Sequence, residues 1–276
     1  MTDNPLLTLA DRVAVEAGQQ ILEVYNSSRD IAVTVKEDDS PLTEADRRSN
    51  AVIVRELARA EPAIPVLSEE SEQQDFSERR GWERYWLIDP LDGTKEFVKR
   101  NGEFTVNIAL IDRGKPVLGV VHVPVTGVTY LGEVGHGAGK RLNNGPVQPI
   151  RCHRIQPGQT ALKVVASRSH RAPELDRQIE RLRRAFPNLE LVSMGSSLKI
   201  CLVAEGEADI YPRLGPTCEW DTAAAHAVLS AAGGTLVDTG FRELRYNQKA
   251  ELLNPHFIAI ADGSYSWQSH FADQSH

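Results

Sequence analysis

The sequence Tyr85-Trp86-Leu87-Ile88 leads directly into Asp89-Pro90-Leu91-Asp92-Gly93-Thr94, so an apolar run ends in two carboxylates. Pro90 has no amide hydrogen and Gly93 permits positive φ, which predicts a buried strand that stops in a sharp turn. Both carboxylates would then point into one small space, where they repel each other unless they share a proton or bind a cation. A hard ion such as Mg²⁺, which prefers oxygen ligands, would relieve this repulsion. The alternative is a solvated turn made of ordinary turn residues.

Two other phosphate-handling motifs are excluded by their spacing. Phosphatases with an aspartate nucleophile need Asp-x-Asp, whereas Asp89 and Asp92 are separated by two residues. The glycine-rich stretch from Gly135 to Lys140 lacks the spacing of a P-loop, and a turn-forming sequence follows it. We expect a flexible hairpin loop there.

Composition and charge describe an ordinary globular protein. The 276 residues are 41% hydrophobic and 25% charged, and the formal net charge is -7. A negative balance argues against binding to a nucleic acid polymer, because such binding needs a basic surface. An anionic substrate would therefore need cations placed locally.

The cysteines and the apolar runs indicate the compartment. Cys152, Cys201 and Cys218 form no Cys-x-x-Cys pair, which argues against a zinc cluster and suits a reducing compartment. No apolar run is long enough for a transmembrane segment, and the first residues do not resemble a secretory signal. We expect a cytoplasmic protein, and the sequence leaves open whether it lies peripherally on the cytoplasmic face of the inner membrane.

Hydrophobic periodicity divides the chain into two halves, 1–150 and 151–276, with a boundary in the Gly- and Pro-containing stretch 145–158. In the first half, two amphipathic helices over about 5–25 and from about Thr43 to Pro62 precede an antiparallel meander over 104–131. The second half alternates strands and helices up to Gly233-Gly234. The charged segment 69–84 is expected to be a long loop, with a mobile flap as one interpretation, and the tail after Gly263 is expected to fray.

Four acidic features recur along the chain: Asp46, Glu69 with Glu70, Asp89 with Asp92, and Glu219-Trp220-Asp221. Taken singly, each has a structural explanation. Asp46 could form a capping box with Thr43, Glu69 could be a solvated loop charge, and Asp221 could cap the alanine-rich helix that follows it.

Together, three motifs resemble those of the Mg²⁺-dependent, lithium-sensitive inositol monophosphatase superfamily. They are Leu67-Ser68-Glu69-Glu70, the run Asp89–Phe97, and Trp220-Asp221-Thr222-Ala223-Ala224. Within it, Lys95-Glu96-Phe97, the run Arg100–Asn107, the run Ser167–His170 and Gly195-Ser196-Ser197-Leu198-Lys199 resemble the 3'(2'),5'-bisphosphate nucleotidases of the CysQ type. The motifs match in order and rough spacing over nearly the whole chain.

The resemblance implies a role for each matching position. Roughly two or three Mg²⁺ ions would be held by the carboxylates of Glu69, Asp89, Asp92 and Asp221 and by the backbone carbonyl of Leu91. Asp46 and Thr94 would orient and deprotonate the attacking water, and Glu69 also counts among the catalytic residues. The substrate-binding positions are Gly93, Thr94, His170, Ser196, Lys199, Arg213 and Asp221.

The implied fold is of the α+β class, a layered α/β/α/β/α sandwich. Its N-terminal antiparallel sheet and helices would carry most metal ligands, and the C-terminal α/β half would supply the nucleotide-binding residues and the last ligand. The implied reaction is hydrolysis of the 3'-phosphate of adenosine 3',5'-bisphosphate to AMP, and also of 3'-phosphoadenylyl sulfate, within sulfur metabolism. Alternatives are an inositol or fructose-bisphosphate phosphatase with the same metal site, and a catalytically silent metal-dependent binding protein. The oligomeric partner stays unknown.

Overall fold

The computed structural model describes residues 4–27, 33–35, 41–166 and 173–271. Its helices are α1 (Pro5–Tyr25), α2 (Glu44–Ala60), α3 (Phe76–Arg79), α4 (Thr94–Val98), α5 (Pro173–Ala185), α6 (Leu198–Ala204), α7 (Glu219–Ala231) and α8 (Gln268–Phe271). The first strands are β1 (Val33–Val35), β2 (Pro41–Thr43), β3 (Val66–Ser68), β4 (Arg84–Asp92), β5 (Thr105–Asp112), β6 (Lys115–Val123), β7 (Val128–Glu133), β8 (Gly137–Leu142) and β9 (Gln148–Ile150). The others are β10 (Ala161–Ala166), β11 (Asn188–Ser193), β12 (Ile210–Arg213), β13 (Thr235–Asp238) and β14 (Phe257–Ile260).

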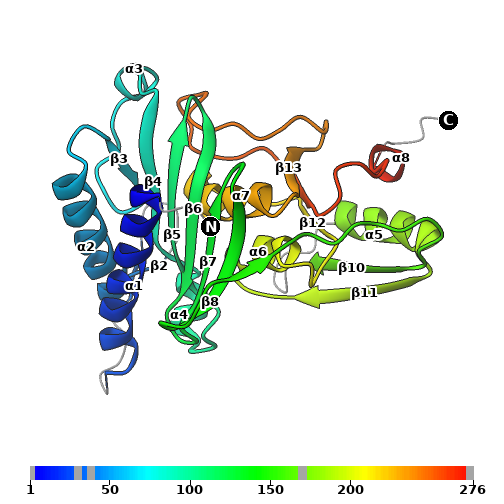
Figure 1. The fold of residues 1–276 in the computed structure, drawn as a ribbon, viewed down its shortest axis with the longest axis horizontal. Coiled ribbons are helices and arrows are strands. Elements are labelled where there is room, and N and C mark those ends of the chain that lie inside the picture. The colour runs from blue at the N-terminus through cyan, green and yellow to red at the C-terminus, as the bar shows by residue number, and fades with distance from the viewer. Residues whose placement is uncertain (1–3, 28–32, 36–40, 167–172, 272–276) are drawn as a thin grey trace.

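Two large sheets and three helical layers build the molecule, and β1 and β2 form a separate antiparallel pair (Figure 1). The larger sheet has seven strands in the order β3-β4-β5-β6-β7-β8-β9, antiparallel except for the parallel pair β3-β4. Helices α1 and α2 cover one of its faces, and α7 packs on the other. The smaller sheet, in the order β11-β10-β12-β14-β13, lies beyond α6 and α7, and α5 and α8 cover its outer face. This order confirms the predicted α/β/α/β/α layering.

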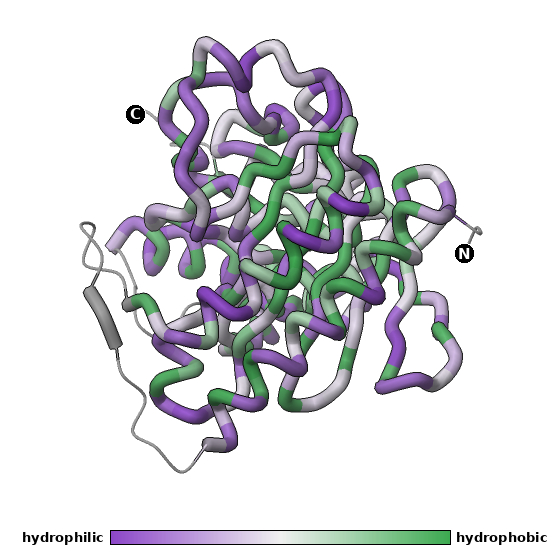
Figure 2. The backbone as a smooth tube through the Cα atoms, turned by 90° about the vertical axis from the view of Figure 1, so that its left-hand side faces the viewer, coloured by the Kyte–Doolittle hydropathy of each residue, from purple (hydrophilic) through white to green (hydrophobic). Residues whose placement is uncertain are grey.

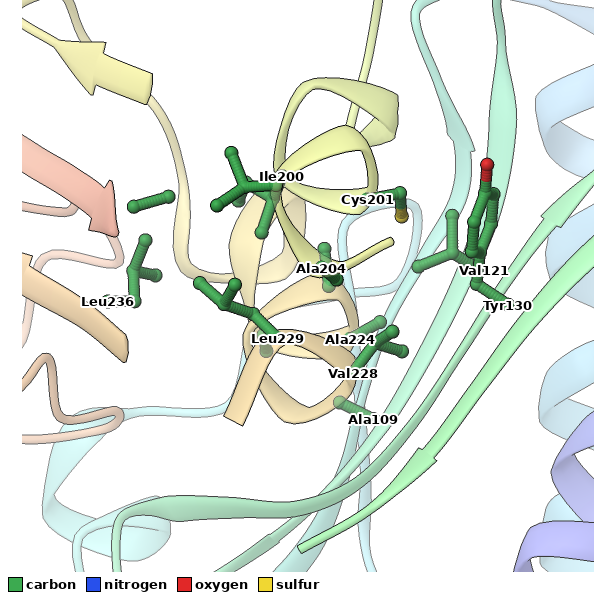
Figure 3. Packing of buried hydrophobic residues seen from close by; sticks show 14 of the residues in the cluster. Ala109, Val121, Tyr130, Ile200, Cys201, Ala204, Ala224, Val228, Leu229 and Leu236 are labelled. Atoms are coloured by element: carbon green, nitrogen blue, oxygen red, sulfur yellow. The ribbon is translucent and has the colours of Figure 1, made fainter. Parts of the chain in front are cut away.

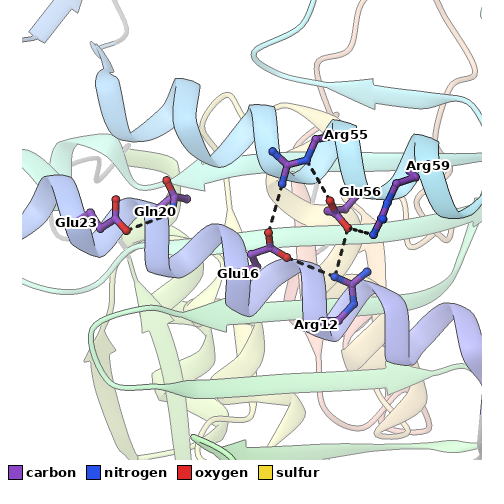
Figure 4. A network of polar contacts seen from close by, with 7 residues as sticks. All are labelled: Arg12, Glu16, Gln20, Glu23, Arg55, Glu56 and Arg59. Atoms are coloured by element: carbon purple, nitrogen blue, oxygen red, sulfur yellow. Dashed lines mark hydrogen bonds and ion pairs between the residues drawn. The ribbon is translucent and has the colours of Figure 1, made fainter.

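Helix α1 forms where the apolar period predicted it. Asn4 caps its N-terminus by accepting a hydrogen bond from the Leu6 amide, and Pro5 occupies the first helical position, where no amide donor is needed. Its buried side chains recur every three or four residues and face the larger sheet. The ion-pair network in Figure 4 lies along the outer side of α1 and α2. Because ion pairs with solvent-exposed arginines contribute little, the apolar contact with the sheet holds this layer in place.

The central layer is alanine-rich because it lies very close to the larger sheet. A Cβ atom added at Gly119 of β6 would lie 2.2 Å from the Ala224 carbonyl oxygen, and one added at Gly132 of β7 would lie 2.5 Å from the Val228 Cα. Small residues on both elements therefore permit the approach of α7. The core seen in Figure 3 joins α6 and α7 to both sheets.

The larger sheet ends at Ile150 and the smaller sheet begins at Ala161, on either side of the expected boundary. Because the core around α7 is shared, the division into two domains stays a prediction. Figure 2 shows that hydrophobic residues run through the middle of the molecule, while loops at its top are largely hydrophilic. Among the helices of the described ranges, none has the length and apolar character needed to cross a bilayer.

Candidate active site

The turn after Ile88 lies where β4 faces the first turn of α7. β4 does not stop at Asp89 as expected. Its pairing with β5 is interrupted after Asp89 and resumes at Asp92, which leaves Pro90 and Leu91 as an irregularity within the strand. The strand ends at Asp92, and Gly93 then adopts φ +94 before α4, which agrees with the positive φ that the sequence permitted there.

Two hydrogen bonds fix the irregular part of β4. The Asp89 carboxylate accepts one from the Leu91 amide at 3.0 Å, and the Ser49 hydroxyl of α2 donates one to the Pro90 carbonyl at 2.7 Å. The Leu91 carbonyl lies 3.4 Å from the Thr94 hydroxyl. The backbone at this turn is therefore held from α2 and from within the turn itself.

Four acids from three separate parts of the chain influence one another here. Burial, together with the charges of Glu69, Asp92 and Asp221, raises the pKa of Asp89 well above its ordinary value. Burial and the Asp92 charge do the same to the pKa of Asp221. The structure thus brings the predicted acids of β4, α7 and the segment after β3 into one electrostatic neighbourhood.

These acids fit a hard cation by their chemistry, since their donor atoms are all oxygens and their mutual repulsion is relieved by positive charge. They are not already arranged as a metal cage: among the residues that the structure describes, no three acidic, His or Cys side chains converge as a ready-made ligand group. Several of the carboxylate oxygens are instead engaged by hydrogen-bond donors.

Ser197 is the main partner of Asp92. Its amide and hydroxyl lie 2.5 and 2.7 Å from Asp92 Oδ2, and the same hydroxyl lies 2.6 Å from the Asp221 carbonyl oxygen. The Asn107 side-chain amide donates to the Ser197 hydroxyl at 2.9 Å. Sequence reasoning gave no role to Ser197 or Asn107, although both lie in stretches that carried the resemblance, and nothing local distinguished Ser197 from Ser196.

Asp221 is not the N-cap residue that was one alternative for it. Helix α7 begins at Glu219 with Cys218 as its N-cap, and Asp221 stands at the third helical position, where its carboxylate accepts the Cys218 amide at 2.8 Å. The residue therefore completes a capping box, and it also lies close enough to Asp92 for the charge of that carboxylate to add to desolvation in raising the Asp221 pKa. The helix extends three residues further toward the N-terminus than predicted.

Asp46 has both of the arrangements considered for it. Its Oδ2 accepts the Thr43 amide at 2.7 Å and the Thr43 hydroxyl at 2.6 Å, which completes the capping box of α2. Its Oδ1 lies 3.4 Å from the Thr94 hydroxyl. Burial raises the pKa of Asp46, although the hydrogen bonds from Thr43 oppose the shift. One carboxylate oxygen of Asp46 thus caps α2, and the other lies near the Thr94 hydroxyl.

A cavity of about 190 Å³ opens beside these acids, and its lining includes Asp92, Gly93, Ser196, Lys199, Arg213 and Asp221. Lys199 is half-buried, and the desolvation of its ammonium group lowers its pKa. Its Nζ lies 5.8 Å from the centre of the Tyr211 ring. Within the described residues, Ser196 Oγ and Arg213 Nε are buried without a hydrogen-bond partner. The lining of this cavity therefore combines carboxylates, cationic side chains and unmet polar groups. His170 lies outside the described residues.

A larger cavity of about 690 Å³ lies at the other end of α7, near Ala231 and Gly233. None of the acids predicted for the site is among its lining residues. The chemistry therefore favours the smaller cavity as the candidate active site.

The class of protein to which this fold and these acids belong is identified by the sequence comparison. Residues 3–270 match the model of the inositol monophosphatase family, and the chain belongs to this family. Enzymes of the family are metal-dependent. The chain is also similar to one branch of this family. It is 46% identical to the 3'(2'),5'-bisphosphate nucleotidase CysQ of Escherichia coli strain K12 over 246 residues, which cover 89% of this chain and 96% of the relative.

Other comparisons agree. The chain is 39% identical to the 3'(2'),5'-bisphosphate nucleotidase CysQ of Haemophilus influenzae, over 94% of each protein. The crystal structure of CysQ from Bacteroides thetaiotaomicron superimposes with a TM-score of 0.82 at 44% identity, covering 94% of this chain and 98% of that one. The suhB protein of Bartonella henselae, at 23% identity and a TM-score of 0.77, shares the fold.

Proposed function

We propose that this protein is a Mg²⁺-dependent 3'(2'),5'-bisphosphate nucleotidase that hydrolyses adenosine 3',5'-bisphosphate to AMP and phosphate. 3'-phosphoadenylyl sulfate would be a second substrate. The observation that carries the proposal is one cavity whose lining holds the Asp92 and Asp221 carboxylates together with Lys199 and Arg213. Such a cavity suits a molecule with two anionic groups: one would bind through metal at the carboxylates, which we call the acidic end, and the other at Lys199 and Arg213, which we call the cationic end. The printed names of the CysQ relatives, at 39% and 46% identity, support the same substrate.

We assign Mg²⁺ to the acidic end, with Glu69, Asp89, Asp92, Asp221 and the Leu91 carbonyl as its ligands. When bound there, roughly two or three ions would neutralise the charge of the phosphate and supply a metal-activated water. Burial in a low-dielectric site favours the protonated forms of these carboxylates, whereas bound Mg²⁺ would keep them ionised. Ser197 would keep Asp92 oriented through its two hydrogen bonds.

Asp46 and Thr94 would move the proton of the attacking water. The Thr94 hydroxyl, 3.4 Å from Asp46 Oδ1, would accept a hydrogen bond from the water and donate its own hydrogen toward the carboxylate. Because burial raises the pKa of Asp46, this carboxylate is a stronger proton acceptor than an exposed one. The Gly93 and Thr94 amides would bind oxygens of the same phosphate.

The cationic end would bind the 5'-phosphate, which the reaction leaves intact. Arg213 presents a planar fork suited to phosphate oxygens, and Lys199 adds a point charge. Ser196 Oγ, buried without a partner in the described part of the chain, would donate to the nucleotide, as would His170. We also propose a cytoplasmic location, since Cys152, Cys201 and Cys218 are all free thiols.

A substrate panel tests the proposal. Phosphate release should be measured from adenosine 3',5'-bisphosphate, inositol 1-phosphate and fructose 1,6-bisphosphate, each with Mg²⁺ and after its chelation. We expect the nucleotide to have the highest kcat/KM, and chelation to remove activity reversibly. A preference for the inositol or fructose ester would reject the nucleotide assignment, and full activity without a divalent ion would reject the metal site.

The Arg213→Ala substitution tests the cationic end. It should cost about 1.5–3 kcal/mol in kcat/KM for adenosine 3',5'-bisphosphate, the range for hydrogen bonds to a charged group. The same variant should change kcat/KM little for 3'-AMP, which has no 5'-phosphate. Arg154→Ala, at the exposed rim of the larger cavity, is the control and should leave both substrates unaffected. Equal fractional losses on the two substrates would remove Arg213 from 5'-phosphate binding.

A further inference from the structure

Arg79 ties the loop after β3 to a distant part of the chain. This loop, residues 69–83, begins with Glu69 and contains α3, which lies at the top of the view in Figure 1. Arg79 is only 2% exposed although the loop is rich in charged residues. Its guanidinium donates to the Asn247 side-chain oxygen and to the carbonyls of Ala250 and, at 3.3 Å, Lys249. A loop that the sequence presented as a possible mobile flap is thus anchored at α3.

Asn247 carries this connection onward to α7. Its side-chain amide donates to the Arg79 carbonyl at 2.6 Å, and its backbone amide donates to Glu219 Oε2 at 2.8 Å. Asn247 adopts φ +58, a left-handed conformation that Asn tolerates better than most residues. The positive φ lets one residue face Arg79 with its side chain and Glu219 with its backbone.

Glu219 is the first residue of α7 and lies two positions before Asp221. It is 3% exposed, and its own amide donates to the Leu252 carbonyl at 2.8 Å. Asn254 adds a hydrogen bond of 2.7 Å from its side chain to the Cys218 carbonyl, at the N-cap of the same helix. The loop that follows β13 therefore holds both α3 and the first turn of α7.

Burying Arg79 and Glu219 is costly, and replacing buried charges by apolar residues often leaves a protein as stable or more so. Their arrangement is better explained by its effect on geometry, because it fixes the loop with α3 relative to the first turn of α7. We propose that Arg79 and Asn247 are positioning residues for the metal site, which hold the loop with Glu69 against the helix turn with Asp221. This role rests on the proposed function, because it requires that Glu69 and Asp221 bind the same Mg²⁺ centre.

The alternative to a positioning role is a role in stability alone. Arg141 of β8 provides a matched control that separates the two. Its guanidinium forms two hydrogen bonds, of 2.5 and 2.7 Å, with the Asp11 carboxylate of α1, and its side chain is 16% exposed. This pair lies on the face of the larger sheet that α1 covers, opposite α7. Arg141→Lys thus disrupts a partly buried arginine fork that has no contact with the proposed metal ligands.

The test compares Arg79→Lys, which keeps the charge but loses the fork, with Asn247→Gly, which keeps the left-handed backbone and loses only the side-chain link. Each variant and Arg141→Lys would be studied as full chains. Mg²⁺ affinity would be measured by calorimetry without substrate, stability by urea unfolding, and amide exchange over residues 69–75 by mass spectrometry.

We expect Arg79→Lys and Asn247→Gly to weaken Mg²⁺ binding about tenfold, as loss of outer partners of a metal site does, and to speed exchange in residues 69–75. Arg141→Lys should leave both unchanged even where it lowers the urea midpoint. Mg²⁺ affinity within about twofold of the wild type in both test variants would overturn the positioning role, because the loss of affinity expected on removing outer partners of a metal site would be missing. A wild-type protein that binds no Mg²⁺ would instead overturn the proposed function, and the positioning role with it.

Discussion

Asp92→Asn should reduce phosphate release from adenosine 3',5'-bisphosphate by more than about a hundredfold while the protein stays folded. Loss of outer partners of a metal typically costs about 10- to 100-fold, so loss of a proposed ligand should cost more. The substitution removes the charge but keeps the shape, and the Asn side-chain oxygen still accepts the Ser197 amide that Asp92 accepts at 2.5 Å. The fold should therefore survive, and relief of charge repulsion at Asp89 and Asp221 would favour it.

The control for this prediction is Asp209→Asn. Asp209 is also buried and accepts two hydrogen bonds, from the Lys163 amide at 2.7 Å and from His153 Nδ1 at 2.6 Å, but it lies by the smaller sheet. This variant should lose stability and keep its kcat. Turnover of Asp92→Asn near the wild-type value, at saturating substrate and Mg²⁺, would exclude Asp92 from the metal site.

Asp46→Asn and Thr94→Ala should each lower kcat by about 10²- to 10⁴-fold and change KM much less. Positioned proton transfer contributes in this range, and it matters mainly in the transition state. Asp46 and Thr94 are 3.4 Å apart and would act as one unit, so the double variant should be little slower than the slower single variant. The measurement is a double-mutant cycle on kcat at saturating adenosine 3',5'-bisphosphate.

A control is needed because Asp46 also caps α2. Thr43→Ala removes the hydroxyl partner of Asp46 Oδ2 and leaves the Thr94 side untouched. It should lower the free energy of unfolding by about 1 kcal/mol, as for a lost cap, with a smaller effect on kcat. Multiplying effects of Asp46→Asn and Thr94→Ala would show that the two residues do not cooperate, and the capping role of Asp46 would be its only one.

Elements with a long, regular apolar period were predictable from the sequence. The helix expected over about 5–25 is α1, and the meander expected over 104–131 contains β5, β6 and β7, so these predictions are confirmed. The glycine-rich stretch expected to be a flexible hairpin loop is largely strand β8, because Ala138 and Gly139 pair with β7. Glycine frequency alone did not reveal that tertiary pairing.

The frayed tail predicted after Gly263 is wrong for the described residues. Trp267 is buried, its indole amide donates to the Asp262 carbonyl at 2.7 Å, and α8 follows it. One isolated tryptophan forms no hydrophobic periodicity, so the pattern of the sequence could not predict that this C-terminal segment packs against the fold. Strands β13 and β14 were also missed, because each has only four residues and a long irregular loop separates them.

The proximity of Asp89 and Asp92 was predictable because proline, glycine and two carboxylates mark the turn in one short stretch. Asp46, Glu69 and Asp221 were singled out only by the family resemblance, and their roles stay predictions. The hydrogen-bond partners that residues far away in the sequence supply were not predictable. Ser197 reaches Asp92 across 105 positions, and Arg79 reaches Asn247 across 168. Only the folded chain brings these residues together, and no local pattern announces such contacts.

The most direct test of the account is the identity of the product formed from adenosine 3',5'-bisphosphate. The wild-type protein with Mg²⁺ should be followed by chromatography that separates 5'-AMP from 3'-AMP, together with a phosphate assay. We predict 5'-AMP and one equivalent of phosphate, because the acidic end of the cavity would take the 3'-phosphate while Lys199 and Arg213 retain the other. Formation of 3'-AMP, or no release of phosphate with Mg²⁺ present, would contradict it.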